Sequence, residues 1–202
     1  MRELSEIVLA SVSPRRYELL TSLGLRVRVV PSFVDEGGRP GYGPLDLALL
    51  HAEAKAEAVF LREPQHVILG ADTVVDLDGT ALGKPQDRTE AASMLRALSG
   101  REHVVHSAFS LIDGARGRRL RRSSSTRVRF YPLGEDEIEA YASSGDGLDK
   151  AGAYGIQGRG APLVERIEGD FYTVMGLPLG QVVRALRELG LGLPATLAQV
   201  AT

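Results

Sequence analysis

Residues 7–20 read Ile-Val-Leu-Ala-Ser-Val-Ser-Pro-Arg-Arg-Tyr-Glu-Leu-Leu, and this stretch decides the fold. Its apolar beginning predicts a short buried strand, and the leucines near its end predict a helix with one apolar face. Ser13 stands at the expected N-cap of that helix, where its hydroxyl can accept a hydrogen bond from a first-turn amide, and Pro14 follows at the first helical position. The stretch therefore predicts a strand, a tight turn and a helix, as in an α/β fold.

Two arginines, Arg15 and Arg16, occupy the first turn of this helix. Cations there oppose the helix dipole, so their position calls for an explanation. A bound anion would supply one, because the free amides, the hydroxyls of Ser11 and Ser13 and both guanidinium groups would converge on it. The alternative is that both arginines are solvated surface charges. The strand–turn–helix context favours the phosphate site.

Hydrophobic patterning and turn residues divide the rest of the chain into elements. We expect strands over residues 26–31, 67–69 and 163–167, two long strands within 101–131, and helices over 45–62, 89–100, 133–141 and 178–189. Asp78-Gly79 predicts a hairpin turn. Residues 37–44 are rich in glycine and proline and predict a mobile loop that acts as a lid.

Composition limits the class of protein. The chain has 202 residues, 44% of them hydrophobic, and a formal net charge of -2. These values predict one two-lobed α/β domain over 1–202 with a peripheral tail after about residue 190, and they give no global field that would attract nucleic acid or membranes. The absence of cysteine excludes disulfides and thiolate metal sites. With no secretory leader or membrane-spanning run, we expect a cytoplasmic protein.

The acidic residues that stand out are Asp72, inside an apolar run at 67–75, and the pair Asp35-Glu36. A buried carboxylate must be paired, metal-bound or protonated, and ligands of open α/β sheets gather at the carboxyl ends of strands. Asp72 is therefore a candidate general base or metal ligand, although an aspartate that caps a turn fits the residues equally. Asp35-Glu36 would suit a metal, but adjacent acids in a loop are usually just solvated.

Two further polar residues, Lys84 and Gln157, are candidates for binding a ligand, whereas Lys55 has the position of a surface residue. Lys84, between a glycine and a proline, would present a fixed point charge to a phosphate. Lys55 lies near the border of the buried face of its helix, where a lone lysine is normally a surface residue. Gln157 follows glycines spaced by three residues, which suggest backbone pressed against a ligand, and its amide can read the edge of a base.

Five motifs occur in the order found in Maf proteins, a family that this chain resembles from about residue 7 to 189. They are Leu-Ala-Ser-x-Ser-Pro-Arg-Arg, Gly-Ala-Asp-Thr-Val-Val, Gly-Lys-Pro-x-Asp, Asp-Lys-Ala-Gly-Ala-Tyr-Gly-Ile-Gln-Gly and Val-Met-Gly-Leu-Pro. The resemblance implies an ITPase-like fold, with a mixed twisted sheet, flanking helices and two lobes around a central cleft. It also implies a nucleoside triphosphate pyrophosphatase that uses Mg²⁺ or Mn²⁺, forms a homodimer and has a house-cleaning role linked to cell division.

The resemblance also implies roles for particular residues. Asp72 matches the family's proton acceptor, and Glu36 matches an acidic position that helps to hold the metal with it. The phosphate-handling positions are Ser11, Arg16, Lys55 and Lys84. Arg15, Thr73 and Gln157 match the branch that acts on dTTP and UTP rather than the branch that acts on 7-methyl-GTP. Modified pyrimidine triphosphates are further expected substrates. Departures from the family pattern are His51, where relatives often carry leucine, and Asp146-Gly147, in place of Glu-Pro.

A non-enzymatic alternative is a regulatory binder that acts on septum formation or nucleic acid. Its anchor would be a basic cluster, Arg118, Arg119, Arg121, Arg122, Arg127 and Arg129. Because aromatic residues do not interleave this cluster, we favour a solvated strand face over a nucleic-acid site. An ordinary ATPase is not indicated, because the chain contains no P-loop pattern.

Overall fold

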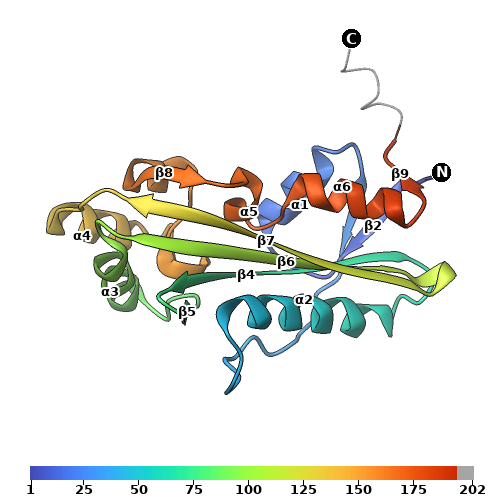
Figure 1. The fold of residues 1–202 in the computed structure, drawn as a ribbon, viewed down its shortest axis with the longest axis horizontal. Helices are drawn as coiled ribbons and strands as arrows, with labels where there is room; N and C mark the ends of the chain where they lie inside the picture. Colours follow the sequence, from blue (N-terminus) through green and yellow to red (C-terminus); the bar gives the residue numbers. More distant parts are fainter. Residues whose placement is uncertain (195–202) are drawn as a thin grey trace, which may run out of the picture.

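A mixed seven-stranded sheet forms the centre of the molecule. The computed structural model describes residues 1–194, and Figure 1 shows its long strands running between helices on both faces. The strands are β2 (Glu6–Leu9), β3 (Arg26–Val29), β4 (Val67–Leu77), β5 (Thr80–Leu82), β6 (Glu102–Asp113), β7 (Arg118–Phe130) and β8 (Val164–Glu168). They lie in the order β3-β2-β4-β6-β7-β8, with β5 beside β4. Pairing is parallel among β3, β2 and β4 and antiparallel elsewhere, so the predicted mixed sheet is confirmed.

The helices cover the sheet unevenly. They are α1 (Pro14–Thr21), α2 (Pro44–Phe60), α3 (Arg88–Leu98), α4 (Glu135–Ser144), α5 (Phe171–Met175) and α6 (Leu179–Glu188), with short 3-10 turns at 114–116, 151–153 and 158–163. Figure 1 shows α2 on one face of the long strands and α1 and α6 on the other. Within residues 1–194, no helix is long and apolar enough to cross a membrane.

Two large hydrophobic cores share one face of β4. One core contains Ala71 and the apolar sides of α1 and α6, and the other contains Val75 and those of α3 and α4. Thr73 lies between them, because alternate residues of a strand point to the same face. Apolar packing on this face is therefore interrupted at Thr73, in the middle of β4.

The predicted elements are confirmed within a few residues, with one exception. The strand predicted over 67–69 continues to Leu77 as β4, so Asp72 lies inside a strand rather than beyond its carboxyl end. Two further details need correction. Ser13 occupies the N-cap position, but its hydroxyl makes no capping hydrogen bond; instead, its amide donates to the Ser11 hydroxyl at 3.3 Å. The packed chain also extends past residue 190. β9 (Leu191–Gly192) pairs with β1 (Arg2–Glu3). Leu191 is fully buried, because its apolar side chain completes the core under α6. The rest of the predicted tail, 195–202, lies outside the described residues.

The contact between α2 and β4 is unusually close. A Cβ atom at Gly70 would lie 2.3 Å from the Ala52 carbonyl oxygen and 2.6 Å from the Ala56 amide nitrogen. The helix backbone therefore sits directly on the strand, which the small side chains of this stretch permit. Because Gly70 and Asp72 share a face of β4, the same approach brings Lys55 of α2 within reach of Asp72.

Replacing Gly70 with alanine should therefore destabilise the protein. The added methyl group has no space, and overpacking of this kind typically costs about 1–3 kcal/mol. Urea unfolding of Gly70→Ala measures the loss. Gly180→Ala in α6 is the matched control, because nothing lies within 4 Å of its Cβ position, and we expect it to be neutral or stabilising. Equal stability of Gly70→Ala and the wild type would contradict the proposed close approach.

Candidate active site

A cleft opens where the parallel strands β2 and β4 part. The chain leaves β2 for α1 on one face of the sheet and leaves β3 for α2 on the other, so a crevice forms at the carboxyl end of β2. The cleft has a volume of about 1470 Å³. Its lining includes all ten of the predicted site residues: Ser11, Ser13, Arg15, Arg16, Glu36, Lys55, Asp72, Thr73, Lys84 and Gln157.

Asp72 forms the charged floor of the cleft on the side of α2. Its carboxylate accepts hydrogen bonds from Lys55 Nζ at 2.7 Å and from His51 Nδ1 at 3.2 Å, and its residue is only 5% exposed. Burial raises the pKa of Asp72, but the hydrogen bond from His51 and the charge of Lys55 outweigh it, so the pKa is lowered. The carboxylate is therefore ionised at neutral pH. The turn cap is wrong, because Asp72 lies within β4 and its carboxylate is paired with Lys55 and His51. Its role as a general base or metal ligand stays a prediction.

Lys55 links the two predicted metal ligands. Its ammonium group lies 3.0 Å from Glu36 Oε1 and 2.7 Å from Asp72 Oδ1, and the residue is buried rather than at the surface. Among residues 1–194, no group of three or more potential ligands is positioned to hold a metal. Mg²⁺ commonly takes only one or two carboxylates and completes its shell with water and substrate phosphates. Asp72 and Glu36 thus fit a divalent cation that binds together with a phosphate chain.

Arg16 is buried and ties three segments together. Its guanidinium group donates to the Gly176 carbonyl at 2.9 Å, to the Ser11 hydroxyl at 3.0 Å and to the Thr73 hydroxyl at 3.0 Å. Burial lowers the pKa of Arg16, and the nearby Asp72 partly offsets this effect. Arginine nevertheless stays charged in proteins. The surface alternative is therefore wrong for Arg16, whose guanidinium group is buried and hydrogen-bonded within the protein. Its convergence with Ser11 and Ser13 on a bound anion stays a prediction.

Thr73 has an internal partner that the sequence did not indicate. Its hydroxyl lies 2.8 Å from that of Ser107, which donates to the Thr173 carbonyl at 2.7 Å. Ser107 uses its one hydroxyl proton on Thr173, so Thr73 accepts from Arg16 and has two acceptors within reach of its own proton, the Ser107 hydroxyl at 2.8 Å and the Gly176 carbonyl at 3.3 Å. This chain of hydrogen bonds holds the Arg16 side chain in place. Direct contact of Thr73 with a base stays a prediction.

The more accessible lining residues surround this floor. Arg15 is half-buried and lies 3.8 Å from Asp149, which leaves most of its donors available to a ligand. Lys84 and Gln157 are exposed. The predicted reason for the glycines near Gln157 needs correction for Gly152 alone, which has a φ of +69° and a Cβ position 2.9 Å from a Val75 methyl group. Gly152 thus serves close packing within the protein. Gly155 and Gly158 line the cleft, and for them the predicted ligand contact stays a prediction.

His51 is the functional residue that sequence reasoning passed over as a family departure. It is 4% exposed, and its Nε2 atom has no hydrogen-bond partner within the described structure. The hydrogen bond to Asp72 raises the pKa of His51, against the lowering effect of burial. Its spacing of four from Lys55 was the available signal, because residues at that spacing share one face of a helix.

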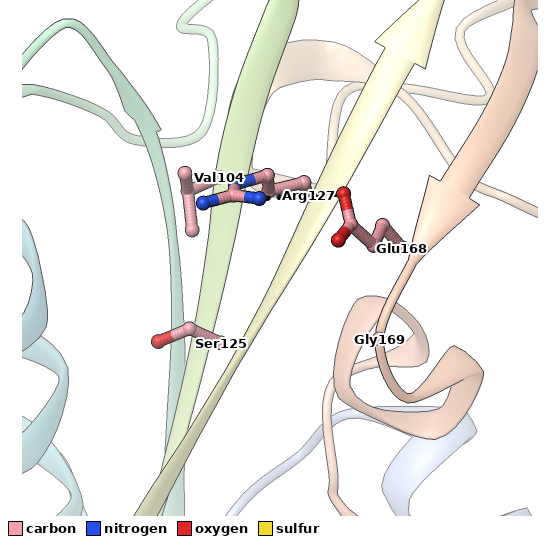
Figure 2. Close-up of a pocket in the computed structure, with 5 residues that line it drawn as sticks. All are labelled: Val104, Ser125, Arg127, Glu168 and Gly169. Carbon is pink, nitrogen blue, oxygen red and sulfur yellow. Dashed lines mark hydrogen bonds and ion pairs between the residues drawn. The ribbon is translucent and has the colours of Figure 1, made fainter.

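The basic cluster lies outside the cleft. Five of its six arginines pair with acidic residues, and Arg118 donates to the Glu188 backbone carbonyl at 2.7 Å. Arg119 contacts Glu57 at 2.8 Å, Arg121 contacts Glu53 at 2.7 Å, and Arg122 contacts Glu188 at 3.1 Å. Figure 2 shows Arg127 opposite Glu168, 3.3 Å apart, beside a second hollow of about 450 Å³. The predicted solvated strand face is therefore confirmed. The nucleic-acid alternative loses the unpaired cations on which it relied.

Fold and cleft together define an α/β protein with a charged ligand site at the point where its parallel strands diverge. The family model described as "Maf-like protein" matches residues 6–189. The chain therefore belongs to the family of Maf-like proteins, as its motifs predicted.

Individual relatives agree with this assignment. A protein of Bacillus velezensis named dTTP/UTP pyrophosphatase is 46% identical over 185 residues, which cover 92% of this chain and 97% of the relative. A protein of Geobacter metallireducens with the same name is 46% identical over 190 residues, which cover 94% and 99%. A solved HAM1 protein from Coxiella burnetii matches with a TM-score of 0.49 and 18% identity over 92% of this chain and 100% of that one, a likeness too weak to carry an argument.

Replacing His51 with leucine should change stability in a pH-dependent way. Because the folded-state pKa of His51 is raised, its contribution is full below the ordinary histidine pKa of about 6.5 and is lost as pH rises through the folded-state value. The stability difference between the wild type and His51→Leu should therefore be largest near pH ~6 and shrink toward pH ~9. Urea unfolding across that range measures it, and a pH-independent difference would refute the contact with Asp72.

Proposed function

We propose that this chain hydrolyses dTTP and UTP to the nucleoside monophosphate and pyrophosphate. The observation that carries the proposal is Asp72, an ionised buried carboxylate at the floor of a cleft, flanked by Lys55 and Arg16. Membership of the Maf-like family and the names of the relatives support the same reaction. Modified pyrimidine triphosphates, a house-cleaning role and a homodimer belong to the same proposal.

The cationic residues of the cleft bind the triphosphate. Lys55 and Arg16 supply fixed buried charge, and Lys84 and Arg15 add cations nearer to the solvent. A hydrogen bond to a charged group typically contributes about 1.5–3 kcal/mol. Because Arg16 is already held by Ser11 and Thr73, little side-chain entropy is lost when the phosphate chain binds.

Asp72 orients a water molecule for attack on the α-phosphorus and accepts its proton. The bond that forms joins the water oxygen to the α-phosphorus, and the bond that breaks releases pyrophosphate. A carboxylate has about four lone-pair sites, and Lys55 and His51 use one on each oxygen. One site on each oxygen thus remains, which leaves room for the water and for a divalent cation. The cations of the cleft stabilise the charge that develops on the leaving group.

Asp72 and Glu36 would hold a divalent cation, Mg²⁺ or Mn²⁺, together with phosphate oxygens. When bound, such a cation neutralises phosphate charge and lowers the pKa of water near it. Lys55 keeps the two carboxylates together at hydrogen-bonding distance. The chain's own contribution is therefore to keep Asp72 ionised and the two carboxylates adjacent.

Arg15 and Gln157 select the pyrimidine base. Gln157 offers both a donor and an acceptor at the exposed rim of the cleft. Thr73 contributes indirectly, because its hydroxyl supports Arg16. The proposed selection is therefore made at the cleft rim, away from the phosphate-binding floor.

Pyrophosphate release from a panel of triphosphates tests the substrate assignment. The panel contains dTTP, UTP, CTP, ATP, GTP, ITP and 7-methyl-GTP, with Mg²⁺ or Mn²⁺. We expect cation-dependent activity that is highest with dTTP and UTP, because relatives about 46% identical are named dTTP/UTP pyrophosphatase. Highest activity with another base would refute the assigned selectivity, and no cleavage by a folded sample would refute the reaction.

Replacing Asp72 with asparagine tests the catalytic assignment. The change keeps the shape of the side chain but removes its charge, so kcat should fall by at least ~10²-fold. Asp76→Asn is the matched control, because Asp76 lies on the same face of β4 but does not line the cleft. Full activity in a folded Asp72→Asn variant would contradict the role of Asp72 as proton acceptor.

A further inference from the structure

Phe33 lies in the loop between β3 and α2 with an unusual conformation. The residue is 86% exposed, and its backbone φ is +55°. A single exposed aromatic residue is ordinary on a protein surface. A left-handed backbone at so bulky a residue is an outlier, and such strain is concentrated at functional sites. The combination points to a use for this side chain.

The segment around Phe33 is held at both ends. Arg62 Nη2 donates to the Pro31 carbonyl at 2.5 Å, and Glu36 pairs with Lys55 at 3.0 Å. Between these two anchors, the neighbours of Phe33 in the chain are half-buried. The left-handed conformation therefore keeps the neighbours packed and turns the ring outward, where it lines the cleft.

Glycine would relieve the strain at this position. The described chain uses glycine at eleven positions with positive φ. The other residues with positive φ, besides Phe33, are Asp78, in the hairpin turn after β4, and the small Ala153. Phe33 is the one residue among these with a large apolar side chain. A glycine at this position would remove the strain but also the phenyl ring, so the ring itself is what the strained backbone retains.

The chemistry of the cleft identifies what the ring contacts. This step rests on the proposed function. A pyrimidine nucleotide has a polyanionic end, which suits the cations on the floor, and a flat aromatic base. Among the other ring-bearing residues of the described lining, Tyr154 is 5% exposed and His51 is 4% exposed. Phe33 is thus the lining residue whose aromatic ring is open to solvent and to a base.

We propose that Phe33 stacks on the nucleobase of the bound triphosphate. Offset stacking of two aromatic rings is favourable and tolerates different bases, so this contact contributes affinity while Gln157 and Arg15 provide selection. The ring removes one face of the base from water. The strained, anchored backbone holds Phe33 near the cleft before the ligand arrives.

A single tryptophan tests the contact directly. The chain contains no tryptophan, so Phe33→Trp introduces one fluorophore at the proposed stacking position. We expect saturable quenching by dTMP and no comparable response to ribose 5-phosphate, which lacks a base. Tyr131→Trp is the control, because Tyr131 is 49% exposed and does not line the cleft. Equal responses from the two variants, or equal responses to the two ligands, would overturn the proposal.

Steady-state kinetics provide a second test. Phe33→Gly removes both the ring and the strain, so KM for dTTP should rise roughly 5- to 150-fold with kcat changed by less than ~3-fold. Its urea midpoint should not fall, because glycine accepts the positive φ. Phe33→Tyr, which keeps the ring, should retain the wild-type KM. A KM for Phe33→Gly within ~2-fold of the wild type would overturn the proposal.

Failure of this inference is distinguishable from failure of the proposed function. If the wild type hydrolyses dTTP but Phe33→Trp shows no quenching specific to dTMP and Phe33→Gly keeps the wild-type KM, the stacking contact is refuted and the pyrophosphatase assignment stands. If the folded wild type neither hydrolyses dTTP nor binds dTMP, both are refuted.

Discussion

The structure depends on the buried ion pair between Asp72 and Lys55. Removing two charges from water costs several kcal/mol per ion, and their attraction compensates only when the geometry is good. Here the carboxylate also receives a hydrogen bond from His51, and the ammonium also contacts Glu36. The pair is thus satisfied on both sides. This arrangement requires α2 to lie directly on β4, which the missing side chain of Gly70 permits.

The topology of the sheet explains why the remaining site residues gather around that pair. β2 leads to α1 on one face of the sheet, and β3 leads to α2 on the other face. The two connections therefore diverge beside the middle of β4, and the cleft lies between them. Asp72 and Thr73 are neighbours on that strand and point to opposite faces. Asp72 meets α2, and Thr73 meets Arg16 of α1. One short stretch of β4 therefore joins both walls of the cleft.

Much of this organisation could be predicted from the sequence. Residues 7–20 indicate the first strand and helix, and the apolar run around Asp72 indicates a buried carboxylate that needs a partner. The identity of that partner could not be predicted, because Lys55 and His51 reach it only through the close approach of α2. The packing role of Gly152 and the left-handed φ of Phe33 likewise depend on contacts between distant segments. Local patterns fix the elements, whereas such partners follow from their three-dimensional register.

The central claim is that the residues around Asp72 direct water to the α-phosphorus of a triphosphate. Hydrolysis of dTTP in ¹⁸O-labelled water tests it most directly, with mass spectrometry of both products after a single turnover. Attack at the α-phosphorus predicts one ¹⁸O atom in the monophosphate and none in the pyrophosphate. Label in the pyrophosphate, or release of labelled inorganic phosphate instead, would contradict the claim.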